Sequence, residues 1–404
     1  MTSLQPCSIT SPPEAALACE LIAGLRRYGA PAHRAEDALR AFTASVDLPI
    51  QFHVLPGAVL ISNAGTAQFL EQEPGLPDLH RLTQLYEIAD AVTHRTLTAQ
   101  EALQRIQAVE NQPDPLSTGL RITAFGAASA STVGFFGGAA HDVLASGLLG
   151  ALGGAVALLL PRIPGAGRLL FTAAGFVTAI GLGALGSVWP LTAQAVLVTS
   201  LIVLLPGFSL TVALTELATR HRLCGTTGLA TSALTLLELG FGVALGTRVS
   251  SLFWDPLTSR AAVVLPPGWE WLSIAVVAIS FAALLEARPV HVWHILGACL
   301  LALHASRLGA SLLGPELGAG FAALVVTLAG NAMSRVSGTP ALVWQMPGVL
   351  LLVPGAIGFT AVQALMDHDA VGGVQGAFAA LMSATALVAG FLLGGALVPP
   401  KRVL

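Results

Sequence analysis

The chain has 404 residues, of which 54% are hydrophobic and 10% are charged, and its formal net charge is −3. A soluble protein of this length needs far more charge to cover its surface, so the composition excludes that class and indicates an integral membrane protein. The mean hydropathy of +0.76 agrees. Residues 1–118 hold 20 of the 41 charged residues. We therefore predict a water-facing N-terminal domain followed by a polytopic membrane domain.

The first 118 residues predict a small α+β domain. The stretches "EAALACELIAGLRRYGA" and "HRAEDALRAFTASV" have apolar residues at helical spacing, and "IQFHVLPGAVLISN" alternates as a pair of strands does. Two further helices are expected in "DLHRLTQLYEIADAVTHRTLTAQEALQRIQAV", the second capped by Thr98 with Glu101. The N-terminus has neither the basic region nor the apolar core of a signal peptide, so we expect this domain in the cytoplasm.

From Leu120 onward we predict about ten transmembrane helices, each of ~20 apolar residues. The expected spans are 120–140, 143–160, 169–187, 195–217, 226–247, 271–286, 289–306, 308–331, 343–366 and 374–396. Five fall in residues 119–260 and five in residues 261–404, which we take as two membrane halves.

Basic residues in the loops predict the orientation. The inner side would hold Arg121, Arg162, Arg168, Arg220, Arg222, Arg288, Arg335, Lys401 and Arg402, and the outer side only Arg248, Arg260 and Arg307. This excess predicts that both termini lie in the cytoplasm, with the chain in the cytoplasmic (inner) membrane as a multi-pass protein.

Two predicted spans are broken at matching places. "LLPGFSLT" carries Pro206 and Gly207, and "LLVPGAIGFT" carries Pro354 and Gly355, 148 residues later. At the same offset Gly225, Gly228, Gly242 and Gly246 align with Gly373, Gly376, Gly390 and Gly394. Because five is an odd number of spans, this repeat would place the second half upside down, as a 5+5 inverted repeat.

A proline and a glycine at mid-membrane free backbone groups, which is tolerable where those groups line a buried polar cavity. The half-helix ends would then hold the carboxylate and the ammonium of a small zwitterion. Ser209, Thr211 and Thr360 bracket the two breaks and are candidate substrate contacts. The alternatives are ordinary proline kinks, and hydroxyls that bond only to carbonyls of their own helix.

Four carboxyl groups in or near the spans are candidate proton carriers, because ionisable groups inside a membrane are costly and tend to be functional. They are Asp142, Glu216, Glu238 and Glu316. Asp142 and Glu216 could instead be interfacial carboxylates, and Glu238 could form an interhelical hydrogen bond.

The sequence contains no GxSxG, HExxH or Walker motif, so we predict neither an enzyme nor transport driven by ATP from within this chain. Its four cysteines are scattered, and no carboxylate joins His291, His294 and His304 within their span. No metal, cofactor or nucleic-acid partner is predicted, and a homo-oligomer is left open.

At this point the chain resembles the threonine/serine exporter family over almost its whole length. The similar stretches include "LRRYGAPAHRAEDALRAF", "FFGGAAHD", "LLPGFSLTVALTEL" and "VSGTPALVWQMPGVLLLVPGAIGFTAVQAL". In that family a cytoplasmic domain precedes about ten spans in two related parts. Asp142 and Glu216 occupy positions at which the family carries acidic residues.

The resemblance implies export of threonine or serine across the lipid bilayer, coupled to the proton-motive force by antiport. We therefore expect a secondary active exporter of small hydroxylated amino acids that works by alternating access. A dicarboxylate exporter of the same fold and an uncoupled channel are the alternatives, and the first would need more basic residues near the site.

Overall fold

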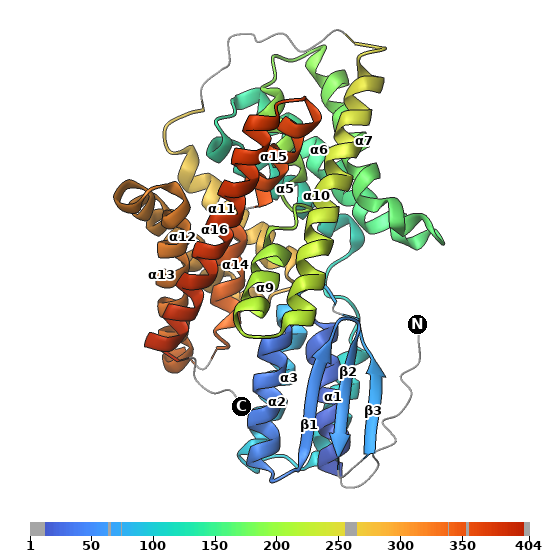
Figure 1. The fold of residues 1–404 in the computed structure, drawn as a ribbon, viewed down its shortest axis with the longest axis vertical. Helices are drawn as coiled ribbons and strands as arrows, with labels where there is room; N and C mark the ends of the chain where they lie inside the picture. Colours follow the sequence, from blue (N-terminus) through green and yellow to red (C-terminus); the bar gives the residue numbers. More distant parts are fainter. Residues whose placement is uncertain are drawn as a thin grey trace.

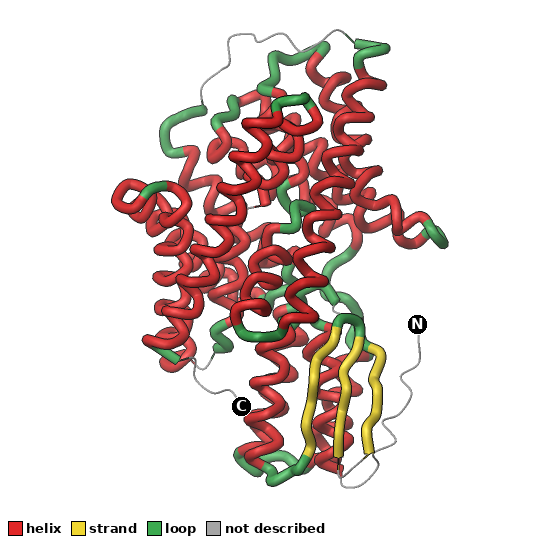
Figure 2. The backbone as a smooth tube through the Cα atoms, viewed as in Figure 1, coloured by secondary structure: helices red, strands yellow, loops and turns green. Residues whose placement is uncertain are grey.

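The structure is a computed structural model that describes residues 13–63, 66–73, 75–254, 265–337, 339–352 and 355–399. Its first elements, which we call the N-terminal unit, are α1 (Pro13–Arg27), α2 (Ala32–Ser45), β1 (Ile50–Leu55), β2 (Ala58–Asn63), β3 (Thr66–Glu71), α3 (Leu79–Thr93) and α4 (Ala99–Glu110). Figures 1 and 2 show this unit at one end of the molecule, with the helices that follow above it.

The N-terminal unit has the mixture of helices and strands that the sequence predicts. The strands form an antiparallel sheet in the order β1-β2-β3, so a third strand joins the predicted pair. The four helices match the four predicted ones, and Thr98 and Glu101 form the expected capping box. The core is apolar and draws on every helix and on β2 through Leu21, Phe42, Val59, Leu85 and Ile106.

The remainder of the described chain is helical. The α-helices are α5 (Thr118–Thr132), α6 (Ala140–Leu159), α7 (Leu170–Gly186), α8 (Ala193–Leu201), α9 (Gly207–Ala218), α10 (Arg222–Ser250), α11 (Trp269–Leu284), α12 (Val292–Leu313), α13 (Pro315–Ser337), α14 (Leu342–Leu351), α15 (Gly355–Met366) and α16 (Ala370–Leu397). Short 3-10 helices extend several of them: η1 (Val133–Phe136), η2 (Leu160–Arg162), η3 (Ala166–Leu169) and η4 (Pro289–His291).

Seven helical segments among the described residues are long and apolar enough to cross a membrane. They are Ala140–Arg162, Ala166–Gly186, Arg222–Ser250, Pro289–Leu313, Pro315–Ser337, Leu342–Met366 and Ala370–Leu397. This agrees with an all-α polytopic membrane protein. The other predicted spans correspond to α5, to α8 with α9, and to α11, which are shorter, so the count of ten spans stays a prediction.

The N-terminal unit contacts one end of the helix bundle. Three hydrogen bonds mark that end: Leu79 N–H to the carbonyl of Leu285 (2.8 Å), Ala32 N–H to Glu216 Oε1 (2.9 Å), and Arg34 Nη2 to Gln345 Oε1 (3.1 Å). Leu285 follows α11, Glu216 lies in the last turn of α9, and Gln345 lies in the first turn of α14. Helices α9 and α11 therefore run towards the N-terminal unit, whereas α14 runs away from it (Figure 1).

Glycines allow several helices to approach closely, and their neighbours repeat at a constant spacing. A Cβ on Gly242 of α10 would overlap the carbonyl oxygen of Thr172 on α7. A Cβ on Gly390 of α16 would likewise overlap the carbonyl oxygen of Gly320 on α13. Both members of the second pair stand 148 positions after those of the first. The helix pair α7–α10 thus packs through the same positions as the pair α13–α16.

The other aligned glycines follow the same rule, and their contacts also differ by 148 positions. Gly225 lies against Ala213 and Leu217, as Gly373 lies against Ala361 and Leu365; Gly228 lies against Ala213, as Gly376 lies against Ala361; and Gly246 lies against Phe176 and Ala179, as Gly394 lies against Leu324 and Thr327. Small residues at such contacts bring helix backbones together in membrane proteins. The glycine spacing therefore reflects helix packing that occurs twice.

Candidate functional site

The helix that carries the first Pro-Gly pair is interrupted. Helix α8 ends at Leu201 and α9 begins at Gly207. Between them the N–H groups of Leu204 and Leu205 both donate to the carbonyl of Leu201, at 2.8 and 3.0 Å. Pro206 takes the N-cap position of α9, where the helix offers no acceptor for a backbone N–H. The proline, which has no N–H, therefore costs α9 no hydrogen bond at this position. A new half-helix begins after it at buried Gly207.

A second interruption lies 148 residues later. Helix α14 ends at Leu351 and α15 begins at Gly355, which is buried. Pro354, the other half of the predicted pair, lies outside the described residues. Pro347 lies within α14 and does not end it. Both predicted breaks thus separate two short helices in the structure.

The two interrupted helices meet. Leu201 and Leu205, at the first interruption, belong to one buried apolar cluster with Ala356 and Phe359 of α15. Helix α9 contacts both α14 and α15. The end of α8, the turn before α9 and the first turn of α15 therefore belong to one buried cluster, and the N-termini of α9 and α15 carry a partial positive charge. This arrangement suits a ligand with an anionic group.

The predicted hydroxyl groups are less well placed for a ligand. Thr211 is buried, but its hydroxyl donates to the carbonyl of Gly207 at 3.0 Å. The hydroxyl of Thr360 donates to the carbonyl of Ile357 at 2.9 Å. Ser209 lies on the exposed side of α9. Thr211 and Thr360 thus form the bonds to their own helices that hydroxyl groups in helices often form.

Asp142 is fully buried and connects two helix starts. Its Oδ2 accepts a hydrogen bond from the N–H of Ala139 at 2.7 Å, ahead of α6. Its Oδ1 accepts from the N–H of Thr192 at 2.8 Å, where α8 begins. A carboxylate that satisfies two free N–H groups at helix N-termini stabilises both helices. Asp142 therefore positions the interrupted helix relative to α6.

Glu216 is buried at the junction between α9 and the N-terminal unit. Its Oε1 accepts a hydrogen bond from the N–H of Ala32, the first residue of α2, at 2.9 Å. Close by, Nε2 of His221 lies 3.2 Å from Oε2 of Glu36, and Oε1 of Glu36 accepts from the N–H of Val54 at 2.7 Å. Two carboxylates thus join α2 to the connection between α9 and α10.

Glu238 and Glu316 differ from these two carboxylates. Among the described residues, neither forms a hydrogen bond or an ion pair, and both are partly exposed. Glu238 lies on α10 between Leu236 and Gly240, which contact α15 at Gly358 and Val362. Glu316 lies in the first turn of α13. Glu238 itself points to a different side of α10, because residues two apart on a helix do not face the same neighbour; what distinguishes it among the four carboxyl groups is its place in the middle of a predicted span without a described partner.

A chain of amide groups continues from the N-terminal unit into the bundle. Arg34 donates to Gln345, whose Nε2 donates to Oδ1 of buried Asn331 at 2.8 Å. Nδ2 of Asn331 in turn donates to the carbonyl of Val398 at 2.6 Å, after α16. The sequence interpretation missed Asn331 and Gln345. An amide inside an otherwise apolar predicted span was the signal that could have revealed them.

The three histidines in and just before α12 do not form one cluster. His291 and His294 lie with ring centroids 5.6 Å apart, but His304 stacks on Trp271 instead. Within the described residues, no group of three or more His, Cys, Asp or Glu side chains could hold a metal ion.

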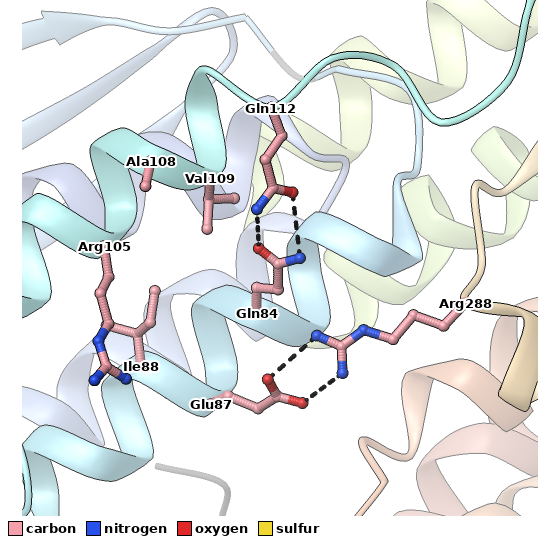
Figure 3. Close-up of a pocket in the computed structure, with 8 residues that line it drawn as sticks. All are labelled: Gln84, Glu87, Ile88, Arg105, Ala108, Val109, Gln112 and Arg288. Carbon is pink, nitrogen blue, oxygen red and sulfur yellow. Dashed lines mark hydrogen bonds and ion pairs between the residues drawn. The ribbon is translucent and has the colours of Figure 1, made fainter.

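A pocket of about 360 Å³ lies where the N-terminal unit meets the loop after α11 (Figure 3). In it Glu87 of α3 forms an ion pair of 2.9 Å with Arg288, and Gln84 pairs with Gln112 through both amide atoms. The guanidinium of Arg288 also donates to Nδ1 of His80, and burial together with this cation lowers the pKa of His80. These polar groups pair with one another, so we interpret the pocket as part of the contact between the N-terminal unit and the loop after α11.

Several curated relatives of this chain are yeast proteins named pheromone-regulated membrane protein 10. It is 24% identical to pheromone-regulated membrane protein 10 of Pichia sorbitophila over 354 aligned residues. The aligned region covers 82% of this chain and 35% of that protein. It is 26% identical over 351 residues to the protein of that name from Saccharomyces cerevisiae, which covers 82% of this chain and 45% of that protein. The chain thus spans less than half the length of these relatives. No solved structure matches it.

Two family models match the chain in order. A model for threonine/serine exporters matches residues 16–250, which include the N-terminal unit and the first interruption. A second model, described as "Threonine/Serine exporter, ThrE", matches residues 270–397, which include the second interruption. Since the first match alone covers more than half of the chain, the chain belongs to the threonine/serine exporter family.

Proposed function

We propose that the protein is a secondary active exporter that carries threonine and serine out of the cell and is driven by the proton-motive force. Membership of the exporter family supports transport of a small molecule across a bilayer. The observation that carries the proposal is the meeting of two interrupted helices in one packed region. In transporters, such half-helix ends bind substrate where two repeats face each other.

In this proposal the two membrane halves form a 5+5 inverted repeat that rocks around the interruptions. Two observations support it. The glycine contacts of α7–α10 and α13–α16 correspond at a spacing of 148 residues. In addition, α9 ends at the N-terminal unit, whereas its counterpart α15 follows a helix that begins there. Opposite senses are what an odd number of spans per half requires.

The substrate would bind between the Pro206–Gly207 and Pro354–Gly355 breaks. Its carboxylate would face the first turns of α9 and α15, where the helix dipoles favour an anion. Because Thr211 and Thr360 already donate to their own helices, and the N–H of Gly207 donates to the carbonyl of Leu205 at 2.8 Å, the proposal assigns binding to the charge of the two helix ends and gives the hydroxyl groups a supporting role.

Glu238 is the proposed proton carrier. Asp142 and Glu216 already accept hydrogen bonds from backbone N–H groups at helix N-termini, so the proposal gives them a structural role. Glu238 has no such partner among the described residues, and it lies on a different side of α10 from Leu236 and Gly240, which contact α15. Glu316 is the second candidate. The N-terminal unit and both termini would lie in the cytoplasm, with the chain in the cytoplasmic membrane.

The test is export of labelled threonine or serine from dipeptide-loaded cells, with and without an uncoupler. Wild type would be compared with Glu238→Gln and with Glu73→Gln, a matched change at an exposed residue of the N-terminal unit. We expect export to be lost in wild-type cells treated with the uncoupler and in cells with Glu238→Gln. Cells with Glu73→Gln should export like untreated wild type. Export that ignores the uncoupler would favour a channel. No export of either amino acid by wild type would overturn the substrate assignment and make dicarboxylates the next substrates to test.

A further inference from the structure

Buried hydroxyl groups surround the C-terminal end of α8, directly before the first interruption. They come from four helices and are at most 3% exposed: Ser129 of α5, Ser146 of α6, Thr178 of α7, and Thr199 and Ser200 of α8. Apart from the polar atoms of these residues, their surroundings are largely apolar. The sequence interpretation did not single out any of them.

Two of the five hydroxyl groups have no hydrogen-bond partner within the part of the chain that the structure describes. The hydroxyls of Thr199 and Ser146 share a hydrogen bond of 2.8 Å, and the hydroxyl of Thr199 also bonds to the carbonyl of Ala195 at 2.7 Å. In contrast, Oγ1 of Thr178 and Oγ of Ser200 are buried and have no partner among the described residues. A buried polar group left unpaired costs about 1–3 kcal/mol. The two unpaired groups lie on α7 and α8, helices that contact each other, and a ligand between these helices could pair with them.

A small gap lies between these groups, at Gly153 of α6. A Cβ added there would lie 3.8 Å from Cδ1 of Leu204, 3.9 Å from the carbonyl oxygen of Ser200 and 4.0 Å from Oγ1 of Thr178. These are ordinary contact distances, so a methyl group would fit. A Cβ on the neighbouring Gly154 would instead press on Phe125, at 2.6 Å. The gap at Gly153 therefore has room for one small group and is lined by oxygen atoms of two helices.

The chemistry of this lining selects the ligand. Hydroxyl groups and a backbone carbonyl present oxygen atoms, which hard cations prefer as ligands. The C-terminal end of α8 adds a partial negative charge, which also favours a cation. No carboxylate is available, because both oxygens of Asp142, one turn before Ser146, are occupied by backbone N–H groups. Neutral oxygen ligands suit a monovalent cation better than a divalent one.

We propose that the hydroxyl of Thr178 and the carbonyl of Ser200, which line the gap at Gly153, bind a sodium ion there, with the hydroxyl of Ser129, which bonds to that carbonyl, as a third ligand. Oγ of Ser129 donates a long hydrogen bond of 3.4 Å to the carbonyl oxygen of Ser200. A small rotation of the Ser129 side chain would break this bond and free both oxygen atoms for the ion. Carbonyls at the end of an interrupted helix bind cations in transporters. Sodium binding stands apart from the proposed export, whereas its influence on the movement of α8 rests on that proposed function.

The experiment is equilibrium binding of ²²Na⁺ to the purified full-length protein in detergent. Two variants remove the site in different ways: Thr178→Val deletes a hydroxyl at constant shape, and Gly153→Ala fills the gap without a clash. The control is Thr231→Val, which deletes an exposed hydroxyl that bonds only to Thr227 of its own helix. Gel filtration would verify that each variant is folded.

Saturable sodium binding is expected in wild type and in Thr231→Val, with at least tenfold weaker binding in Thr178→Val and Gly153→Ala. Absence of saturable binding in wild type, or unchanged binding in both site variants, would overturn the proposal. If the site variants lose threonine binding and keep sodium binding, the cluster holds the substrate's ammonium group and the sodium assignment is wrong. Intact sodium binding without amino-acid export would count against the proposed function alone.

Discussion

The backbone N–H of Ala32 donates a hydrogen bond of 2.9 Å to Oε1 of Glu216, although 184 positions separate the two residues. Ala32 is the first residue of α2, and Glu216 lies in the last turn of α9, the half-helix that follows the first interruption. A carboxylate at a helix N-terminus is stabilised by the free N–H groups and by the helix dipole. The N-terminal unit is thereby attached to one of the helices that the proposed transport would move.

Glu216→Ala should weaken this attachment. The change leaves the Ala32 N–H buried without an acceptor and removes the negative charge near Arg26, so a loss of about 2–3 kcal/mol in stability is expected. Glu216→Gln keeps an acceptor oxygen and should cost less. Thermal unfolding of the purified protein would measure both. The exposed change Asp37→Asn is the control. Equal stability of Glu216→Ala and the control would contradict the role assigned to this bond.

Asp142→Asn should lower stability and leave the pH dependence of export unchanged. Its carboxylate accepts from the N–H groups of Ala139 and Thr192, and an amide can accept from only one of them. A loss of about 1–3 kcal/mol is expected from the second, unpaired N–H. Folded yield and the pH profile of export would be measured together. A shifted pH profile at normal folded yield would instead identify Asp142 as a proton carrier.

The two symmetric helix contacts should respond alike to an added methyl group. Gly242→Ala and Gly390→Ala each force a Cβ onto a backbone carbonyl of the neighbouring helix, and each should destabilise the protein by about 1–3 kcal/mol or prevent folding. Gly395→Ala, on α16 with no atom within 4 Å of the added Cβ, is the matched control and should be neutral. Detergent-resistant folded yield would be compared. Tolerance of either site change would show that the corresponding helices can separate.

His33, at the start of α2, should make stability depend on pH. Burial, with the nearby Arg34 and His221, lowers its pKa from 6.5 to about 3. Below pH 6.5 the unfolded chain takes up a proton that the folded protein excludes, so this contribution to stability is complete above pH 6.5 and is lost towards pH 3. The slope is at most about 1.4 kcal/mol per pH unit.

His33→Gln should flatten this dependence between pH 6.5 and pH 4, as measured by unfolding in detergent. The exposed His53 of β1 offers a control, because His53→Gln should keep the slope of the wild type. A wild-type slope that survives in His33→Gln would locate the responsible group elsewhere.

Local sequence was sufficient to predict the two helix interruptions and the spacing of the aligned glycines. Pro206 cannot donate a backbone hydrogen bond, so the end of a helix near it follows from covalent chemistry. The spacing of 148 residues was visible as well, and the structure adds that Gly242 and Gly390 contact residues with the same spacing. The third strand, β3, was missed since Phe69 and its neighbours are largely exposed and lack a strong alternation.

Partners distant in the sequence could not be predicted. Asp142 and Glu216 were recognised as unusual carboxyl groups, but the N–H groups that bind them belong to Thr192 and Ala32. Likewise, the hydroxyls of Thr178 and Ser200 are ordinary in an apolar helix until neighbouring helices bury them without a partner.

The sequence alone determined that this protein is a helical membrane protein with a separate polar N-terminal segment and two interrupted helices. These properties depend on hydropathy and on the backbone chemistry of proline and glycine, which act within one segment. Only the tertiary structure decided which carboxylates are occupied by helix N-termini, which hydroxyls remain unpaired, and where α2 contacts the bundle. Those outcomes depend on which backbone and side-chain groups meet after helices from different parts of the chain have packed together.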